Sequence, residues 1–345
     1  MSARPRTDEA ARAARLLRIV AGFRGRRVVV LGDLVADEFL YGDIARVSRE
    51  APVLILEHHR TISAPGGGGN AVANLAALGA RPVPVGIVGR DESGKRLTEA
   101  LARGGVSTRT ILAAEGYETP SKCRVLAGGV HTRRQQIVRI DRGARHGELE
   151  SATRRELRRR LVAALAGAEA LLVADYGYGA ASPATLSGLL GKQLSRGLVV
   201  TVDSRTRVAE YRGVTACTPN QEELERALGL ASAVADDELP ECGRRLLRRS
   251  GNRSVLVTRG AKGMLLFERG RPPLAIPAWG SDEVADVTGA GDTVIAAFTL
   301  ALLGGADGAD AARIANYAAG VVVRKSGTAT TTPAELAAAI REDLA

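Results

Sequence analysis

The segment DVTGAGD, Asp286 to Asp292, places two glycines and a carboxylate directly before the apolar run TVIAAFTLALLGG. Gly289 and Gly291 let the chain turn tightly into a helix, so the N–H groups of Gly289, Ala290 and Gly291 are expected to lie free at its N-terminus. Such a terminus binds anions. An Asp in a first helical turn is ordinarily a cap. In phosphoryl transfer, however, a carboxylate accepts the proton of the attacking hydroxyl while N–H donors face the phosphoryl oxygens, and the segment predicts both parts.

A second glycine segment, APGGGGN, precedes another predicted helix. Its spacing Gly66-x-Gly68-x-x-Ala71 formally matches the dinucleotide fingerprint, but that fingerprint follows a buried strand and here TISAP precedes it. The P-loop pattern GxxxxGK[ST] is absent from the sequence. Two interpretations stay open: close approach of the backbone to a polyhydroxyl ligand, with Asn70 as donor and acceptor, or a sharp turn that packs a helix on a sheet.

Polar and acidic side chains recur where predicted strands end. Each of them alone is more commonly a turn residue or a helix cap. Because ligands of open α/β sheets bind at the carboxyl ends of the strands, their recurrence on one edge favours a shared site. These residues are Asp33, Asp37, Asp91, Asp175, Asp203, Asn220, Thr258 and Gly260.

Strands and helices alternate along most of the chain, which predicts an α/β fold built of right-handed βαβ units with a mostly parallel sheet. Two β-rich segments, 40–61 and 119–141, interrupt the alternation and are expected to pair into a small sheet beside the main one. The second of them reads as a hairpin with Gly-Gly at its turn. An amphipathic helix over 8–22 forms an N-terminal extension, 1–25, before one main domain, 26–345.

Composition excludes several classes of protein. The three cysteines, Cys123, Cys217 and Cys242, are odd in number and lack CxxC spacing, so neither a disulfide framework nor a zinc site is indicated and a cytoplasmic location is expected. Neither a signal peptide nor an apolar run near the roughly 20 residues of a membrane helix is visible, so no membrane partner is expected.

The net charge of +10 is mostly arginine, much of it in RRELRRR (154–160) and RRLLRRSGNR (244–253). Nucleic-acid-binding modules combine such charge with stacking aromatics or a recognisable reading motif. Aromatic residues make up only 3% of the chain and no such motif occurs. We therefore expect solvated surface charge and no nucleic-acid partner.

Taken together, these motifs resemble a known family. DVTGAGD resembles the C-terminal signature of the PfkB, or ribokinase-like, sugar kinases, and APGGGGN resembles their N-terminal glycine motif. TPNQEE (218–223) resembles the Asn-x-x-Glu element of the family, and VTRGAKG (257–263) its nucleotide-binding turn. The resemblance runs from about Val28 to Glu335. It implies a three-layer α/β/α fold with a mostly parallel central sheet, a small β-sheet lid formed by 40–61 and 119–141, and a kinase domain over 26–345.

Within the family the resemblance is greatest to the D-glycero-β-D-manno-heptose 7-phosphate kinases, through stretches such as GDLVADEFLYG (32–42), ADYGYG (174–179) and AAGVVVRKSGTAT (318–330). It implies ATP-dependent phosphorylation at the anomeric O1, giving heptose 1,7-bisphosphate for ADP-heptose synthesis. The sequence ends at Ala345 with no nucleotidyltransferase domain, so a stand-alone kinase is expected.

Two departures from the heptose kinase pattern, AGGVHTRR and ADEFLYGDIARVSRE, fall in the expected lid and leave the sugar open. One alternative is another PfkB kinase that acts on a hexose phosphate, a pentose or a nucleoside. The other is a catalytically silent sugar-binding regulatory protein, although the intact Asp292 argues against it.

The resemblance also implies roles for individual residues. Asp292 would be the base that activates the anomeric hydroxyl, beside an anion hole of Gly289, Ala290 and Gly291. The residues expected to hold sugar hydroxyls are Asp33, Asp37, Gly67, Asn70 and Asp175. Those expected to face the 7-phosphate are Lys122, Arg124 and Arg139, for which solvated strand charge is the other interpretation. The residues expected at the nucleotide are Asn220, Glu223, Thr258, Gly260, Asn316 and Gly327.

The expected cofactors and partners follow from the same resemblance. ATP and a sugar phosphate are the substrates, and Mg²⁺ is organised by Asn220 and Glu223, with Glu223 acting through water. Asp286 and Thr288 lie where the family often has a monovalent-cation loop, which leaves K⁺ open. Because lids of this family often pair between subunits, a homodimer through the β lid is expected.

Overall fold

The computed structural model describes residues 4–128, 135–143, 149–280 and 284–344. Its central sheet has eight strands in the order β14-β13-β12-β11-β10-β9-β1-β4. The pairs from β4 to β12 are parallel, and β13 and β14 are added antiparallel at one edge. The strands are β1 (Arg27–Gly32), β4 (Arg81–Val85), β9 (Ala170–Asp175), β10 (Val199–Ser204), β11 (Ala216–Cys217), β12 (Ser254–Thr258), β13 (Met264–Glu268) and β14 (Leu274–Ile276).

Helices cover both faces of this sheet, because its strands carry apolar side chains on both sides. In β1, Val28 and Val30 join one buried cluster while Val29 and Leu31 join the other. The first cluster includes side chains of α1 (Arg4–Ala21), α2 (Gly68–Ala77), α3 (Glu92–Arg103), α9 (Ala290–Leu303), α10 (Gly308–Val323) and α11 (Pro333–Leu344). The second includes side chains of α4 (Ser151–Ala164), α5 (Pro183–Leu186), α7 (Gln221–Leu228) and α8 (Leu239–Ser250). The predicted three-layer α/β/α architecture is confirmed.

The remaining short elements connect these layers. They are β5 (Ile87–Gly89), β6 (Leu112–Ala114), α6 (Leu190–Leu194) and the two 3₁₀ turns η1 (Val208–Glu210) and η2 (Gly260–Lys262). Strands β5 and β6 pair parallel as a separate two-stranded sheet. Within the described residues no helix is long and apolar enough to cross a membrane.

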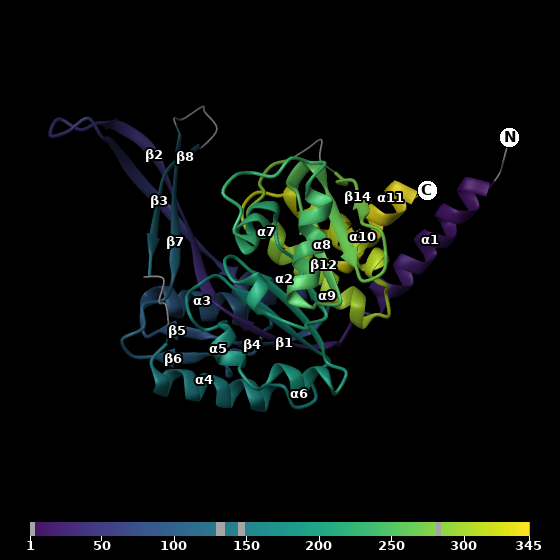
Figure 1. The fold of residues 1–345 in the computed structure, drawn as a ribbon. Helices are drawn as coiled ribbons and strands as arrows, with labels where there is room; N and C mark the ends of the chain where they lie inside the picture. Colours follow the sequence, from purple (N-terminus) through teal and green to yellow (C-terminus); the bar gives the residue numbers. More distant parts are fainter. Residues whose placement is uncertain (1–3, 129–134, 144–148, 281–283, 345) are drawn as a thin grey trace.

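A four-stranded lid sheet, in the order β3-β2-β7-β8, stands beside the body, and its long hairpin projects from it (Figure 1). The strands are β2 (Leu34–Val47), β3 (Leu54–Gly67), β7 (Ser121–Gly128) and β8 (Gln135–Arg142). The two β-rich segments therefore pair as predicted, although 40–61 is only the outer part of a hairpin that begins at Leu34. The Gly-Gly turn predicted within 119–141 lies outside the described residues.

The N-terminal helix α1 packs against the body at the side away from the lid (Figure 1). Leu16 and Phe23 are fully buried in the same cluster as α9 and α10. Arg15 makes a bidentate ion pair with Asp310 of α10, with N–O distances of 2.5 and 3.0 Å. The described part of the N-terminal extension therefore contributes side chains, Leu16 and Phe23 among them, to the core of the main domain.

Candidate active site

The candidate site is built around Asp292 in the first turn of α9, and its carboxyl group is almost completely buried. The hydroxyl of Tyr176 donates to its Oδ1 at 2.7 Å, and the Nδ2 of Asn70 donates to its Oδ2 at 2.9 Å. Burial raises the pKa of Asp292 to about 6, although these two hydrogen bonds act in the opposite direction. A carboxyl group with this pKa is ionised at neutral pH and still basic enough to accept a proton.

The turn before α9 is shaped by Gly289, whose φ of +80° lies in the left-handed region. A Cβ built there would lie 2.4 Å from Asn70 Nδ2, so a larger residue would displace the side chain that holds Asp292. Gly291 lines the neighbouring cavity, and as the second residue of the helix it has no acceptor within the helix for its N–H.

The expectation that Ala290 contributes a free N–H needs a correction. Its N–H donates to the carbonyl of Val287 at 3.3 Å, because the chain closes a turn before the helix begins. An anion hole at this turn would therefore use the N–H groups of Gly289 and Gly291 and that of Asp292, together with the positive end of α9.

The glycine segment at the start of α2 has two roles: its glycines pack the helix on β1, and Asn70 contacts Asp292. Gly67 has a φ of +53°, and a Cβ on Gly68 would lie 2.7 Å from the Cα of Gly32, so these glycines form a sharp turn that packs α2 on β1. Asn70 itself faces the site and contacts Asp292. Its Oδ1 accepts a hydrogen bond from Asn74 at 3.1 Å, and Asn74 Oδ1 accepts one from Thr293 at 2.9 Å. The sequence analysis did not identify Asn74, which links α2 to α9.

Two acids expected to hold sugar hydroxyls instead hold protein groups. Asp33 is fully buried, and its pKa is raised to about 6 by burial and by the charge of Asp175. Its carboxylate accepts backbone N–H groups of the 176–181 loop, from Tyr176, Tyr178, Ala180 and Ala181. Asp175 accepts hydrogen bonds from Gly177, Ser204, Arg207 and Tyr211. Both carboxylates are occupied, so this geometry favours shaping the loop over contact with a sugar.

The other residues expected on the sugar side lie on the lid. Asp37 and Arg124 form a largely buried ion pair at 2.7 Å. Lys122 Nζ lies 5.6 Å from the centre of the Tyr176 ring, and its charge lowers the pKa of Asp292. Arg139 differs, because its half-exposed guanidinium is paired with Asp141 of the same strand at 2.9 Å.

Arg205 is a cation that the sequence analysis did not single out. Burial lowers the pKa of Lys122, and the charge of Arg205 lowers it further. The same guanidinium favours the ionised form of Glu223, which partial burial disfavours. Arg205 follows β10 directly, so it carries positive charge at the sheet edge that faces both the lid and the expected phosphate end of ATP.

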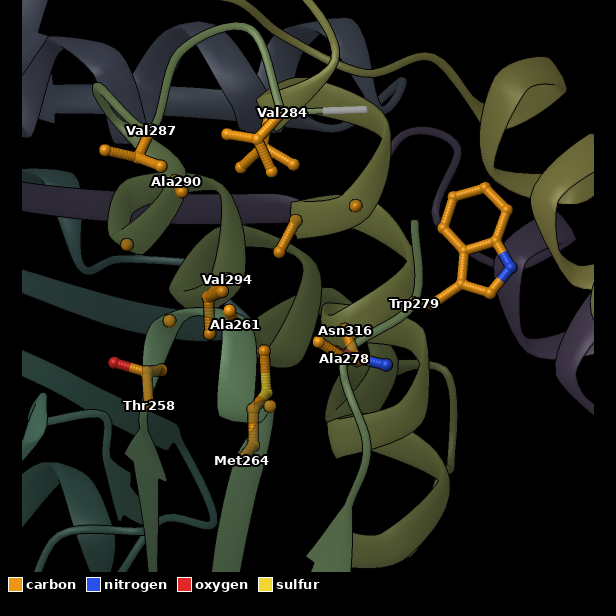
Figure 2. A pocket seen from close by; sticks show the side chains of 16 residues that line it. Thr258, Ala261, Met264, Ala278, Trp279, Val284, Val287, Ala290, Val294 and Asn316 are labelled. Carbon is orange, nitrogen blue, oxygen red and sulfur yellow. The ribbon is translucent and has the colours of Figure 1, made fainter. Parts of the chain in front are cut away.

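A cavity of about 380 Å³ opens beside the N-terminus of α9 (Figure 2). Thr258, Gly260 and Asn316 line it as expected, and most of its other side chains are apolar, including Met264 and Val294. Ala290 and Gly291 also line it, so it reaches the turn that carries the base. A mostly apolar cavity with few polar groups suits a purine base.

Gly327 is not among the described residues that line this cavity. Its N–H donates to Asp286 Oδ2 at 3.0 Å, and the N–H of Thr288 donates to Asp286 Oδ1 at 2.9 Å. Although partial burial disfavours the charge, these hydrogen bonds hold the pKa of Asp286 below its usual value. Gly327 therefore belongs with the Asp286 loop, where the monovalent-cation loop was expected.

The Asn-x-x-Glu element begins α7 as a capping box. Asn220 Oδ1 accepts the N–H of Glu223, and Glu223 Oε2 accepts the N–H of Asn220, both at 2.9 Å. Nearby Asp203 has a pKa raised well above its usual range by burial and then by the charges of Glu223 and Asp292. A divalent cation would relieve this repulsion. Within the described residues no group of three His, Cys, Asp or Glu side chains is arranged to hold a metal ion.

Fold and site together define an ATP-dependent carbohydrate kinase. Residues 26–335 match the model of the pfkB family of carbohydrate kinases, and the chain belongs to this family. It is 43% identical over 326 residues to the bifunctional protein HldE of Mesorhizobium japonicum, covering 94% of this chain and 64% of that protein. For HldE of Geobacter sulfurreducens the identity is 41% over 310 residues, covering 89% and 61%. The chain thus spans less than two thirds of the length of these relatives.

Solved structures confirm the fold. A ribokinase of Arabidopsis thaliana complexed with ribose and ATP superposes with a TM-score of 0.68 at 22% identity, covering 92% of this chain and 99% of that chain. Phosphofructokinase-2 of Escherichia coli in complex with substrates and products gives a TM-score of 0.73 at 18% identity, with the same coverage. The predicted ribokinase-like fold is confirmed.

We expect Asp292→Asn to lower kcat roughly a thousandfold or more, because an amide cannot accept the hydroxyl proton, while ATP binding persists. In the unsubstituted protein kcat/KM should rise with pH through about 6, as the Asp292 carboxyl loses its proton, and then level off. Steady-state kinetics from pH 5 to 8 measure both.

Asp307→Asn is the matched control. It makes the same substitution at the N-cap of α10, where Asn also caps well. Near-normal turnover of Asp292→Asn would refute the base assignment.

Proposed function

We propose that this chain transfers the γ-phosphoryl group of ATP to the anomeric hydroxyl of D-glycero-D-manno-heptose 7-phosphate, giving heptose 1,7-bisphosphate for ADP-heptose synthesis. The observation that carries the kinase chemistry is the buried Asp292 at the N-terminus of α9, between the nucleotide cavity and the lid cations. The sugar assignment is supported by the HldE relatives, whose name denotes the heptose kinase/adenylyltransferase, and by the heptose kinase resemblance of the sequence.

In the proposed reaction the sugar hydroxyl donates to the Asp292 carboxylate, which takes the proton as the new O–P bond forms, while the bond from the γ-phosphorus to the oxygen bridging it to the β-phosphate breaks and ADP leaves. The free N–H groups at the start of α9 stabilise the charge on the transferred phosphoryl oxygens. Asn316, Thr258 and Gly260 lie at the nucleotide. Mg²⁺ bound through water near Glu223 and Asp203 would neutralise phosphate charge. K⁺ is proposed to bind at the Asp286 loop.

A cytoplasmic location is also proposed, because the three buried cysteines are free, as in a reducing compartment.

The phosphate of the sugar is proposed to meet Lys122 on the lid, with Arg205 facing it from the sheet edge. Within the described residues Lys122 makes no salt bridge, whereas Arg124 forms one with Asp37 and Arg139 forms one with Asp141. A partly buried ammonium that no described carboxylate pairs with favours binding of an anion.

A coupled assay of ADP release over a panel of sugars and sugar phosphates tests the substrate. Heptose 7-phosphate should give the highest kcat/KM, because its phosphate and its hydroxyls are the groups that the lid and the base are proposed to recognise. Equal or better turnover of fructose 6-phosphate, ribose or a nucleoside would refute the heptose assignment. No turnover with any acceptor would favour the sugar-binding regulatory protein.

Lys122→Ala should raise KM for the phosphorylated sugar about tenfold or more, because it removes a charged hydrogen bond, and should leave KM for ATP nearly unchanged. Arg139→Ala should raise it less, because Asp141 already holds that guanidinium at the lid surface. Lys192→Ala, a lysine on α6 outside the lid, is the control. An unchanged KM for the sugar in Lys122→Ala would remove this residue from the phosphate site.

The lid is also proposed to pair with a second copy of the chain. It exposes large apolar side chains that a monomer would leave in water. They are Ile44, Val47, Val53, Leu54, Ile62, Ile137, Val138 and Ile140. A homodimer would cover them.

Light scattering should give twice the chain mass of 36.0 kDa for the unsubstituted protein and a single chain mass for Val138→Asp. The aspartate introduced by Val138→Asp would have to be buried in the proposed interface, and burying an unpaired charge is strongly unfavourable. Val162→Asp changes an equally exposed valine on α4, outside the lid, and should leave the mass unchanged. A monomeric unsubstituted protein, or a dimeric Val138→Asp, would contradict a lid interface.

A further inference from the structure

Tyr176, in the loop that follows β9, reaches the catalytic base from the side opposite Asn70. Its hydroxyl donates to Asp292 Oδ1 at 2.7 Å, while Asn70 Nδ2 donates to Oδ2 at 2.9 Å. Each carboxylate oxygen has two lone pairs, so the two donors leave one on each oxygen for a substrate hydroxyl. Together they fix the plane of the carboxylate, because rotation about its Cβ–Cγ bond would break both hydrogen bonds.

The backbone of Tyr176 is held as firmly as its hydroxyl. Its N–H donates to Asp33 Oδ2 at 2.9 Å, and the same carboxylate accepts three further N–H groups of the 176–181 loop. Asp33 lies between β1 and β2, so the loop is attached to the junction of the main sheet and the lid. This attachment gives a physical reason for the full burial of the Asp33 carboxylate.

The ring of Tyr176 is also confined by its neighbours. A Cβ on Gly67 would lie 3.3 Å from the ring carbon Cδ2, so the glycine turn provides room for it. On the lid, Lys122 Nζ lies 5.6 Å from the ring centre, within the range of a cation–π contact. The ring thus connects the lid, the glycine turn and the base.

Tyr176 remains a hydrogen-bond donor throughout. Burial raises the pKa of Tyr176 well above its usual value, and the negative charges of Asp292 and Asp203 raise it further. It therefore neither accepts the substrate proton nor passes it on. Its effect is exerted through Asp292, whose charged form it stabilises.

We propose that Tyr176 is a positioning residue for the phosphoryl transfer: its hydroxyl sets the orientation of the Asp292 carboxylate, and its ring couples that orientation to Lys122 of the lid. This inference rests on the proposed kinase function. It assigns to the ADYGYG segment a role that neither the glycine motifs nor the nucleotide-binding motifs contain.

Tyr176→Phe keeps the ring and removes only the hydroxyl. It should lower kcat about tenfold or more and shift the acid limb of the kcat/KM profile upward by roughly one pH unit, because Asp292 loses a donor to its charged form. KM for ATP should stay within about twofold, because the nucleotide cavity is not changed. A merely structural tyrosine would not move the pH limb.

Tyr211→Phe is the matched control. Its buried hydroxyl has one proton, which is shared between the carboxylate of Asp175 at 2.8 Å and the carbonyl of Ala181 at 2.6 Å, so it supports the same loop without touching Asp292. Its acid limb should stay where it is in the unsubstituted protein. The proposal would be overturned if Tyr176→Phe left both kcat and the acid limb of the kcat/KM profile unchanged, or if Tyr211→Phe shifted that acid limb by the same amount.

A second measurement does not depend on turnover. Because the folded-state pKa of Asp292 lies above its unfolded value, its ionisation lowers stability as pH rises through about 6, and loss of the Tyr176 hydroxyl should increase that loss. The deficit in Tm of Tyr176→Phe should therefore be larger at pH 8 than at pH 5. A deficit that does not grow with pH refutes the contact, whereas absence of turnover with every sugar refutes only the proposed function.

Discussion

The site depends on one costly arrangement, a carboxylate buried at the start of an apolar helix. Removing a charged group from water is strongly unfavourable unless hydrogen bonds and opposite charges compensate. For Asp292 the compensation comes from Tyr176, from Asn70, from the positive end of α9 and from Lys122 on the lid. Because these groups belong to four separate segments of the chain, the Asp292 carboxylate is held in place only when the whole fold is formed.

The other buried acids serve this arrangement from a distance. Asp33 binds the backbone of the loop that presents Tyr176, and Asp175 binds Arg207 and Tyr211 behind it. Protein donors take the place of water around each of these carboxylates, so hydrogen bonds to side chains fix the conformation of the loop in the absence of regular secondary structure. The buried acids thus have two uses: Asp33 and Asp175 shape the loop, whereas Asp292 and Glu223, in the first turns of their helices, and Asp203, at the end of β10, surround the proposed reaction.

Much of the fold could be predicted because its signals are local. The apolar run after DVTGAGD predicted a helix, which the structure contains as α9 (Ala290–Leu303). The alternation of strands and helices predicted the parallel sheet, and the two β-rich segments predicted the lid. The start of the lid hairpin was harder to predict from the sequence. Strand β2 follows β1 after a single residue, Asp33, and no turn signal marks where the chain leaves the main sheet.

The sequence by itself determined the family, because short motifs with characteristic spacing carry it, and the same motifs predicted Asp292 as the base and Thr258, Gly260 and Asn316 beside a cavity that the structure contains. Only the tertiary structure decided how each acid and cation is used. Asp33 and Asp175 bind the protein, Gly327 binds Asp286, and the N–H of Ala290 closes a turn. Tyr176 meets Asp292 from 116 positions away. Spacing along the chain does not encode such contacts, because which donor satisfies a buried carboxylate depends on the packing of distant segments.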